Sequence, residues 1–421
     1  MARPGSLGNF GTSWPGRGWA GVQQPTCQEK PMTFPIRLAL VSPLALVLAS
    51  PALAEYDPVS TEHYSLSVET VAEGLDHPWG FAFISDDRFL VTERNAGTLR
   101  VGSREGGVSE AIWEAPDLFR YDGETGRSQA GLFDVVLHPE FDENRYAYVS
   151  YSRETERGAA VVVVRGRVVD EDGDIRFDDV EDIFVMKEDD QDSSGLHFGG
   201  RMAFDPATSH LYLSIGERRN LERAQDAADQ AGSVLRMTDT GDVPDDNPQF
   251  TAEEGEPDRY IFSMGSRNIQ ALGVHPTTNE VWAADHGPQG GDEINLIIAG
   301  NNYGWPFITG GEDYSGAPLG VGTAMEGKIS PVHIFEDTLA PSGLTFVADG
   351  SSFGDWTGDM LIGGLRGEGV VRVTLQDGQV VNEELIEIGR RIRDVKIGPD
   401  GDLWVLTEHG DGEVLRLSPQ S

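Results

Sequence analysis

The sequence repeats one pattern six times. In each copy a short alternating apolar strand leads through a turn of Pro, Asp, Asn or Gly into a second β-rich strand that ends in polar residues. The copies begin at Gly80, Phe133, Arg201, Ala271, Gly343 and Arg393. Aligned on equivalent apolar residues, they lie 54, 67, 70, 72 and 51 residues apart. Each interval suits a four-stranded antiparallel sheet with one or two long loops.

Six such sheets favour one architecture. A four-stranded sheet buries one face poorly by itself, so neighbouring sheets stack radially and six of them close into a β-propeller. The sequence therefore predicts an all-β, six-bladed propeller that occupies residues 55–421 as a single domain. A pair of β-sandwiches is the alternative, but it does not predict six similar strand pairs. The only helical-looking segment, Leu221 to Ala231, is interpreted as a loop decoration.

The N-terminal segment reads as a targeting signal. Residues 38–49 are LALVSPLALVLA, preceded by Arg37 and followed by Ala-Leu-Ala ending at Ala54. This pattern predicts a signal peptide over residues 32–54, cleaved after Ala54, and a periplasmic or secreted protein. The apolar run is too short to span a bilayer as a mature helix. Residues 1–31 are interpreted as a non-native or disordered extension.

Charge and cysteine content exclude several classes of function. The chain has 32 Lys and Arg against 70 Asp and Glu, a formal charge of −38, so nucleic acid and anionic membranes are unfavourable partners. The single cysteine, Cys27, precedes the expected cleavage site. The mature chain would then have no disulfide, no cysteine-bound metal and no cysteine nucleophile. An anionic ligand would require cations to be gathered locally.

Two polar segments suggest a base with a neighbouring carboxylate. His197 stands in a Gly-rich stretch just before an inner strand, where it can act as a base near neutral pH. The second strand of the same repeat ends in Gly216-Glu217-Arg218, which places a carboxylate at the same mouth. The alternative is a histidine that is only hydrogen-bonded structurally.

Two further segments carry cations and amide donors. Arg267 and Asn268 lead into another inner strand, and alternation places Arg391 and Arg393 on one side of a third. Guanidinium groups suit carboxylates because their planar fork donates two parallel hydrogen bonds. In so acidic a chain, arginines that point toward a channel indicate an anionic ligand, unless they pair with surface acids.

An acidic, glycine-rich loop suggests a hard cation. It runs from Asp285 to Asn295 and is followed by NNYGWP from Asn301. Carboxylates and exposed carbonyls suit Ca²⁺, which prefers six to eight oxygen ligands. An ordinary acidic loop is the alternative. Dinucleotide, P-loop, zinc-helix and serine-elbow motifs are absent from the sequence, so the segments together imply a ligand with several carboxylates, held with calcium beneath a histidine.

These motifs resemble a known family from about Leu75 to Ser418. LDHPWG, GLFDVVLHPEF, HFGGR, DHGPQGGDEIN, NNYGWP and RIRDV occur in the order found in soluble, periplasmic aldose sugar dehydrogenases that depend on pyrroloquinoline quinone (PQQ), the glucose/sorbosone dehydrogenases. The resemblance implies a six-bladed propeller that oxidises the anomeric carbon of aldoses to lactones. Hydride would pass to PQQ and electrons to an unidentified external acceptor.

The resemblance also implies roles for individual residues. His197 resembles the general base, and Glu217 matches an acidic residue that orients it. The positions that resemble PQQ-binding residues are Gln129, Arg267, Asn268, Gln270, Tyr314, Gly364, Arg366, Arg391 and Arg393. The carbonyls of Gly287 and Pro288 resemble the ligands of a Ca²⁺ that contacts PQQ, and Glu293 with the Tyr303 carbonyl resembles a second, structural calcium site.

The sequence departs from the family at two places and leaves other functions open. Ile269 stands where relatives usually have Pro, and Arg366 where a Lys often supports the quinone. A calcium-dependent propeller lactonase and a non-catalytic sugar- or protein-binding propeller are the alternatives. We expect a monomer or homodimer; the preferred aldose does not follow from these motifs.

Overall fold

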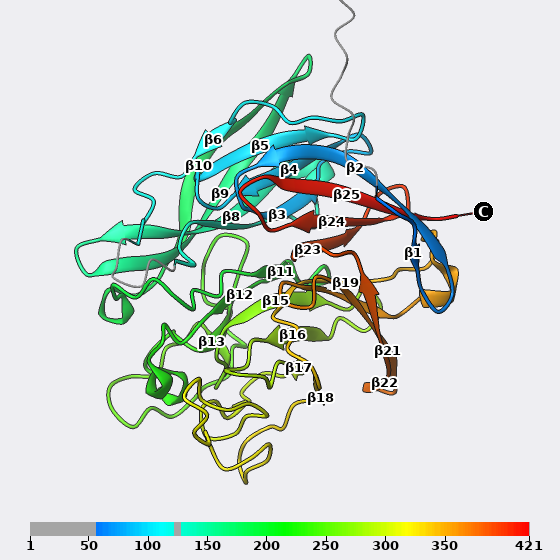
Figure 1. The fold of residues 1–421 in the computed structure, drawn as a ribbon. Coiled ribbons are helices and arrows are strands. Elements are labelled where there is room, and N and C mark those ends of the chain that lie inside the picture. The colour runs from blue at the N-terminus through cyan, green and yellow to red at the C-terminus, as the bar shows by residue number, and fades with distance from the viewer. Residues whose placement is uncertain (1–55, 122–127, 421) are drawn as a thin grey trace, which may run out of the picture. The chain divides into compact units, whose positions relative to one another are not determined.

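The inner strand of every repeat lies where the sequence predicts it. The computed structural model describes residues 56–121 and 128–420, so the expected extension, signal peptide and Cys27 lie outside the described residues. Six antiparallel sheets, the blades, surround a common axis (Figure 1). The described part of the chain is thus a six-bladed β-propeller, as predicted.

Each blade is named in chain order from its innermost strand outward. Blade 1 contains β3 (Pro78–Phe83), β4 (Arg88–Glu93), β5 (Thr98–Ser103) and β6 (Trp113–Glu114). Blade 2 contains β7 (Leu132–Leu137), β8 (Tyr146–Thr155), β9 (Gly158–Glu171) and β10 (Asp174–Val185). Blade 3 contains β11 (Met202–Phe204), β12 (Leu211–Ile215), β13 (Ser233–Met237) and β14 (Ile261–Met264).

The second half of the ring follows the same plan until its last blade. Blade 4 contains β15 (Ile269–Val274), β16 (Val281–Asp285), β17 (Glu293–Ile297) and β18 (His333–Ile334). Blade 5 contains β19 (Pro341–Phe346), β20 (Met360–Gly364), β21 (Gly369–Gln376) and β22 (Gln379–Glu387). Blade 6 contains β23 (Ile392–Ile397), β24 (Leu403–Thr407), β25 (Gly412–Pro419), β2 (Ser65–Leu75) and β1 (Val59–Ser60).

Blade 6 joins the two ends of the described chain. Strand β2 pairs antiparallel with β25, with Leu66 opposite Pro419 and Val68 opposite Leu417. Figure 1 shows the blue β2 beside the red β25. The inner strands also contact one another in sequence around the axis, and β23 contacts β3. The ring is therefore closed by backbone hydrogen bonds inside one blade.

The repeated burial pattern explains why the repeats are recognisable. In β3, β7, β15 and β23 four buried residues precede two partly exposed ones. Both faces of an inner strand are covered by neighbouring blades, so the buried half needs no polar alternation. On the next strand, Tyr212, Trp282 and Trp404 occupy matching positions in three blades, and all three are buried.

Helices are short among the described residues. They are α1 (Phe141–Asn144) and the 3₁₀ helices η1 (Glu188–Asp190), η2 (Leu221–Gln225) and η3 (Gly354–Trp356). The segment from Leu221 to Ala231 is a loop decoration as expected, but its helix ends at Gln225. No helix in residues 56–121 and 128–420 is long and apolar enough to cross a membrane.

Candidate active site

His197 and Glu217 form a buried pair at one end of blade 3. His197 lies in the loop before β11 and Glu217 just after β12, and Nδ1 of the imidazole is 2.5 Å from Oε2 of the carboxylate. The backbone N–H of His197 donates to Oε1 of Gln129 at 2.7 Å. A Cβ atom on Gly216 would lie 2.3 Å from the His197 carbonyl oxygen, so a glycine is required for this approach.

The environment keeps this imidazole neutral. Burial lowers the pKa of His197 to about 4, against the opposing effect of Glu217 and with the help of Arg267 and Arg219. Burial alone would raise the pKa of Glu217, but the bond to His197 and the nearby Arg267 lower it. At neutral pH an ionised carboxylate therefore faces a neutral imidazole. When Nδ1–H donates to Glu217, Nε2 carries the basic lone pair.

Arg218 braces the strained loop that carries His197. The φ angle of His197 is 52°, in the left-handed region. The buried guanidinium of Arg218 donates to the Leu196 carbonyl at 2.6 Å and lies 3.5 Å from the centre of the Phe198 ring. It thus holds the residues on both sides of His197. An ion pair, 3.4 Å long, also joins Arg218 to Asp192.

Arg267 and Asn268 are fixed by a carboxylate from the neighbouring strand. Their backbone N–H groups donate to Asp285 at 2.7 and 2.6 Å. The Arg267 guanidinium donates to the His286 carbonyl at 3.0 Å, and Oδ1 of Asn268 accepts from the N–H of Gly199 at 3.1 Å. The buried Nδ2 of Asn268 has no hydrogen-bond partner among the described residues, so this donor is available to a ligand.

Three arginines converge on the single carboxylate of Glu408. Arg391 Nε lies 2.9 Å from Oε2, while Arg94 Nη1 and Arg393 Nη2 lie 2.9 and 3.3 Å from Oε1. Arg393 Nη1 also donates to Oε1 of Gln270 at 2.8 Å. Burial would raise the pKa of Glu408, but the three guanidinium groups lower it to about 2. One carboxylate leaves two of the three positive charges uncompensated within this group.

The arginine group and the His197 pair belong to one site. Gln270 lies on β15, two residues after Asn268, which directly precedes this strand. His286 lies between the two groups: its Nε2 is 2.7 Å from the Pro341 carbonyl, and its pKa is lowered to about 3 by burial together with Arg267, Arg393 and His197. Burial likewise lowers the pKa of Arg393 to about 9, so this cation is held at an electrostatic cost that an anion would relieve.

Three expected cofactor residues are joined to this site less directly. The exposed Tyr314 ring lies 5.7 Å from the Arg219 guanidinium, and the Arg219 N–H donates to Glu217 at 3.1 Å. Gly364 ends β20 opposite Pro341. Arg366 is exposed and donates only its backbone N–H, to Leu339 at 2.9 Å. Within the described residues, no ion pair or hydrogen bond joins its guanidinium to the other site residues.

Part of the expected calcium-binding region fits a cation. Burial, together with nearby Asp285 and Asp292, raises the pKa of Glu293 to about 8. Oε1 of Glu293 accepts from Asn295 Nδ2 at 2.9 Å, while the buried Oδ1 of Asn295 has no donor in the described part of the chain. A cation beside these oxygens would stabilise the carboxylate and supply the missing partner.

Other features limit how far the fit extends. Residues 56–121 and 128–420 contain no cluster of three or more His, Cys, Asp or Glu side chains arranged for a metal. Gly287 donates its N–H to Asp292 at 2.8 Å, and a Cβ on it would lie 2.1 Å from the Gly290 carbonyl oxygen. Tyr303 is buried in blade 4, and no described hydrogen bond joins it to Glu293. Any calcium site here must draw on backbone carbonyls, such as those of Gly287 and Pro288.

Comparison with known proteins identifies the family. Residues 75–416 match the model of the glucose/sorbosone dehydrogenases. The chain belongs to this family. It is 37% identical to the aldose sugar dehydrogenase YliI of Escherichia coli over 363 residues, which cover 85% of this chain and 94% of that protein. This agrees with the resemblance found in the motifs, and it makes the chain a relative of sugar dehydrogenases.

Two other relatives of this glucose/sorbosone dehydrogenase are described as quinone-linked. Quinoprotein glucose dehydrogenase B of Acinetobacter calcoaceticus is 26% identical over 306 residues, covering 67% of this chain and 60% of that protein. The PQQ-bound aldose sugar dehydrogenase of Streptomyces coelicolor superposes with a TM-score of 0.67 at 25% identity, covering 86% of this chain and all of that one.

Some residues of this candidate site were not predicted from the sequence. Asp285 and Glu408, like Glu217 and Glu93, stand at or just after the end of the second strand of a repeat. All four carboxylates accept hydrogen bonds from basic side chains or backbone N–H groups around the mouth. The polar residues that end the second strand of each repeat are the sequence feature that could have identified these carboxylates. No sequence feature indicates the role of Arg218, because its stacking on Phe198 depends on the path of the loop.

Proposed function

We propose that this glucose/sorbosone dehydrogenase oxidises the anomeric carbon of aldose sugars to the lactone with PQQ as the electron acceptor. The observation that supports this most is the set of three arginines around Glu408, taken together with the neutral, buried His197. PQQ is a flat ortho-quinone with three carboxylates, and the three guanidinium groups here share a single carboxylate. When bound, it would supply the two-electron acceptor for hydride from the sugar.

The fit of this ligand is supported by unpaired donors. The buried Nδ2 of Asn268 and Nε of Arg393 have no hydrogen-bond partner among the described residues. Buried donors without partners are costly, and carboxylate oxygens would satisfy them. Asn268, Arg267, Gln270, Arg391 and Arg393 are the residues that we expect to hold the cofactor. Gln129, Tyr314, Gly364 and Arg366 remain candidates at its edge.

His197 is the residue that we expect to accept the proton of the substrate. Nε2 of the neutral imidazole would accept the proton of the anomeric hydroxyl while hydride leaves the same carbon. Glu217 would stabilise the imidazolium that forms, because its carboxylate lies 2.5 Å from Nδ1. The proton and the hydride together account for the two electrons and two protons lost when a hemiacetal becomes a lactone. Electrons would then pass to an acceptor outside the chain.

Calcium would serve this site if it binds beside Glu293 or at the carbonyls of Gly287 and Pro288. The raised pKa of Glu293 and the unpaired Oδ1 of Asn295 support a cation there. A cation near the cofactor would offset the charge of its carboxylates. The Tyr303 carbonyl remains a candidate ligand. The expected export of the protein after cleavage at Ala54 would place this chemistry in the periplasm or outside the cell.

Reconstitution tests the proposal. Purified protein is mixed with PQQ and Ca²⁺, several aldoses are added, and reduction of an artificial dye is followed. We expect turnover that requires PQQ. Hydrolysis of lactones without PQQ would instead identify a lactonase, and absence of both PQQ binding and turnover would identify a non-catalytic propeller.

A matched pair of histidine variants locates the base. His197→Ala should keep PQQ binding and lose roughly 10²–10⁴-fold in turnover. His333→Ala removes another histidine–carboxylate pair, the 2.7 Å contact with Glu383 in blades 4 and 5, and should leave turnover unchanged. Equal activity of His197→Ala and wild type would exclude His197 as the base.

A further inference from the structure

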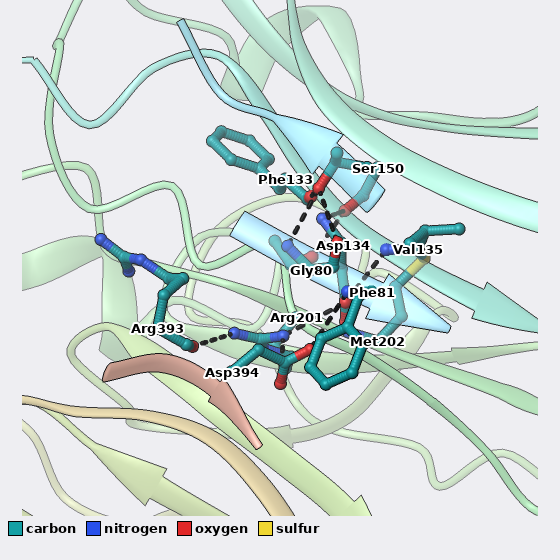
Figure 2. Close-up of polar contacts among 12 residues, drawn as sticks. Gly80, Phe81, Phe133, Asp134, Val135, Ser150, Arg201, Met202, Arg393 and Asp394 are labelled. Carbon is teal, nitrogen blue, oxygen red and sulfur yellow. Dashed lines mark hydrogen bonds and ion pairs between the residues drawn. The ribbon is translucent and has the colours of Figure 1, made fainter. Parts of the chain in front are cut away.

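Arg201 contacts all six blades from the centre of the propeller. It directly precedes β11 in blade 3 and is 1% exposed. Its guanidinium carbon lies 4.0 Å from the centre of the Trp79 ring in blade 1. The polar partners of the guanidinium come from the other four blades and are Asp134, Gln270, Ser342, Arg393 and Asp394. Figure 2 shows the side chain beside Asp134, Arg393 and Asp394.

One side of the guanidinium is an ion cluster. Nη1 lies 3.2 Å from Oδ1 of Asp134 and 3.1 Å from Oδ1 of Asp394, and both carboxylates are fully buried. The other oxygen of Asp134 accepts the N–H of Met202 at 2.9 Å (Figure 2). Lys396 lies 3.7 Å from Asp394. Two cations therefore balance two carboxylates on this side of Arg201.

The other side of the guanidinium holds the backbone of the candidate cofactor site. Nε donates to the Gln270 carbonyl at 3.0 Å, and Nη2 donates to the Arg393 carbonyl at 3.1 Å. Nη2 also lies 3.5 Å from the Ser342 hydroxyl. These contacts come from blades 4, 5 and 6, so one guanidinium group joins the main chain or side chains of three inner strands.

The same residues are joined a second time by the side chain of Arg393. Its Nη1 donates to Oε1 of Gln270 at 2.8 Å and lies 3.3 Å from the Ser342 hydroxyl. Ser342 in turn donates to the Arg393 carbonyl at 2.7 Å. Arg201 therefore binds the main-chain carbonyls of Gln270 and Arg393, while the side chain of Arg393 binds the side chains of Gln270 and Ser342. The guanidinium carbons of Arg201 and Arg393 lie 4.0 and 5.6 Å from the centre of the Trp79 ring.

We propose that Arg201 is a positioning residue for the cofactor. It sets the spacing and direction of Gln270 and Arg393 through their carbonyls. The side-chain donors of these two residues are thereby pre-organised for a planar, multiply charged anion. The inference rests on the proposed function, since Gln270 and Arg393 matter in this way only if they bind PQQ. Arg201 itself touches neither substrate nor cofactor in this arrangement.

A purely structural role makes a different prediction. If Arg201 only joined the blades, its replacement would lower thermal stability, and the folded fraction would bind PQQ with normal affinity. Asp134 provides the comparison, because it contacts the guanidinium on the side away from Gln270 and Arg393. Asp134→Asn disturbs the ion cluster while both carbonyl contacts of Arg201 can remain.

The test compares PQQ affinity with stability. Wild type, Arg201→Lys and Asp134→Asn are titrated with PQQ, with quenching of intrinsic fluorescence as the readout, well below the midpoint of thermal unfolding of each. Lysine keeps the charge but cannot donate in three directions within one plane. We expect Arg201→Lys to weaken PQQ binding by about 10-fold or more, since two carbonyl contacts are lost. Asp134→Asn should lower the unfolding midpoint and keep PQQ affinity within about twofold.

A milder variant covers the case in which Arg201→Lys does not fold. Ser342→Ala removes only the hydroxyl that the guanidinium groups of Arg201 and Arg393 both contact. We expect a PQQ affinity lower by about threefold or more. Normal affinity in both folded variants, or equal losses in Arg201→Lys and Asp134→Asn, would overturn the inference while leaving the proposed function intact. Failure of wild type to bind PQQ would overturn both.

Discussion

The imidazole of His197 and the carboxylate of Glu217 are 2.5 Å apart, although 20 residues separate them in the chain. They come from either side of the first hairpin of blade 3, which brings the loop before β11 against the turn after β12. Because Nδ1 is committed to the carboxylate, the ring has one defined tautomer at neutral pH. This relationship makes the pH behaviour of the site predictable.

Turnover should persist to unusually low pH. The pKa of His197 is lowered to about 4, so the base is neutral and active above that value and becomes protonated as the pH falls through it. We expect kcat/KM to be flat from pH 7 to 5 and to decline with a midpoint near 4. A midpoint near the ordinary histidine value of about 6.5 would contradict the buried setting.

The carboxylate of Glu217 should affect both the rate and this profile. It opposes the lowering of the His197 pKa, so Glu217→Gln should shift the midpoint to still lower pH and reduce kcat roughly tenfold or more, because the imidazolium loses its counter-charge. The pH–rate profile of the variant checks both. A lower rate with an unshifted profile would mean that Glu217 does not act through His197.

Removal of Arg218 should lower kcat while PQQ affinity is kept. Arg218→Met loses the bond to the Leu196 carbonyl and the stacking on Phe198, so the left-handed His197 is held less firmly. Arg153→Met is the matched control: Arg153 pairs with Asp182 at 2.6 Å and lies over Tyr151 in blade 2. Steady-state kinetics and PQQ titration of both variants give the comparison. Equal kcat losses would show a general effect on stability.

Because of Glu408, the free energy of unfolding should depend on pH in the acid range. Its pKa is about 2 in the folded chain against 4.5 ordinarily, so its contribution is complete above 4.5 and is lost as the pH falls through 2. The shift corresponds to on the order of 3 kcal/mol. Urea unfolding of wild type and Glu408→Gln at several pH values measures it. The two free energies of unfolding should converge toward pH 2, and a constant difference would contradict the assignment.

Calcium should stabilise the protein through Glu293. A bound cation relieves the repulsion that raises the pKa of this carboxyl, so a chelator should lower the midpoint of thermal unfolding and added Ca²⁺ should restore it. Glu293→Gln should abolish this dependence. Glu280→Gln, at the exposed β15–β16 turn, should retain it. An unchanged midpoint on chelation in wild type would argue against a structural calcium site.

The fold was predictable because the sequence pattern of one blade occurs six times. Four buried residues followed by two partly exposed ones recur in four inner strands, and the intervals between copies match complete blades. The closure of blade 6 by β2 was not predicted. An outer strand has one exposed edge and a weak apolar signal, and its partner β25 stands more than 300 residues away, so local pattern gives no register.

The candidate site was predictable where a functional group stands beside a repeat. His197, Arg267, Arg391 and Arg393 all flank or begin inner strands. Arg201 also precedes an inner strand and was noticed only as the start of a copy. The sequence could not distinguish it from its neighbours, because its importance depends on side-chain contacts from blades that are far apart in the chain.

The pairing of β2 with β25 constrains the order in which the protein can fold. Residues 65–75 are synthesised more than 300 residues before their sheet neighbours at 412–419. The ring must therefore stay open, with β2 lacking this neighbour, until residues 412–419 are available. A chain that ended after blade 5 would hold five sheets and an unpaired β2, so exposure to proteases and aggregation should end only when β25 pairs with β2.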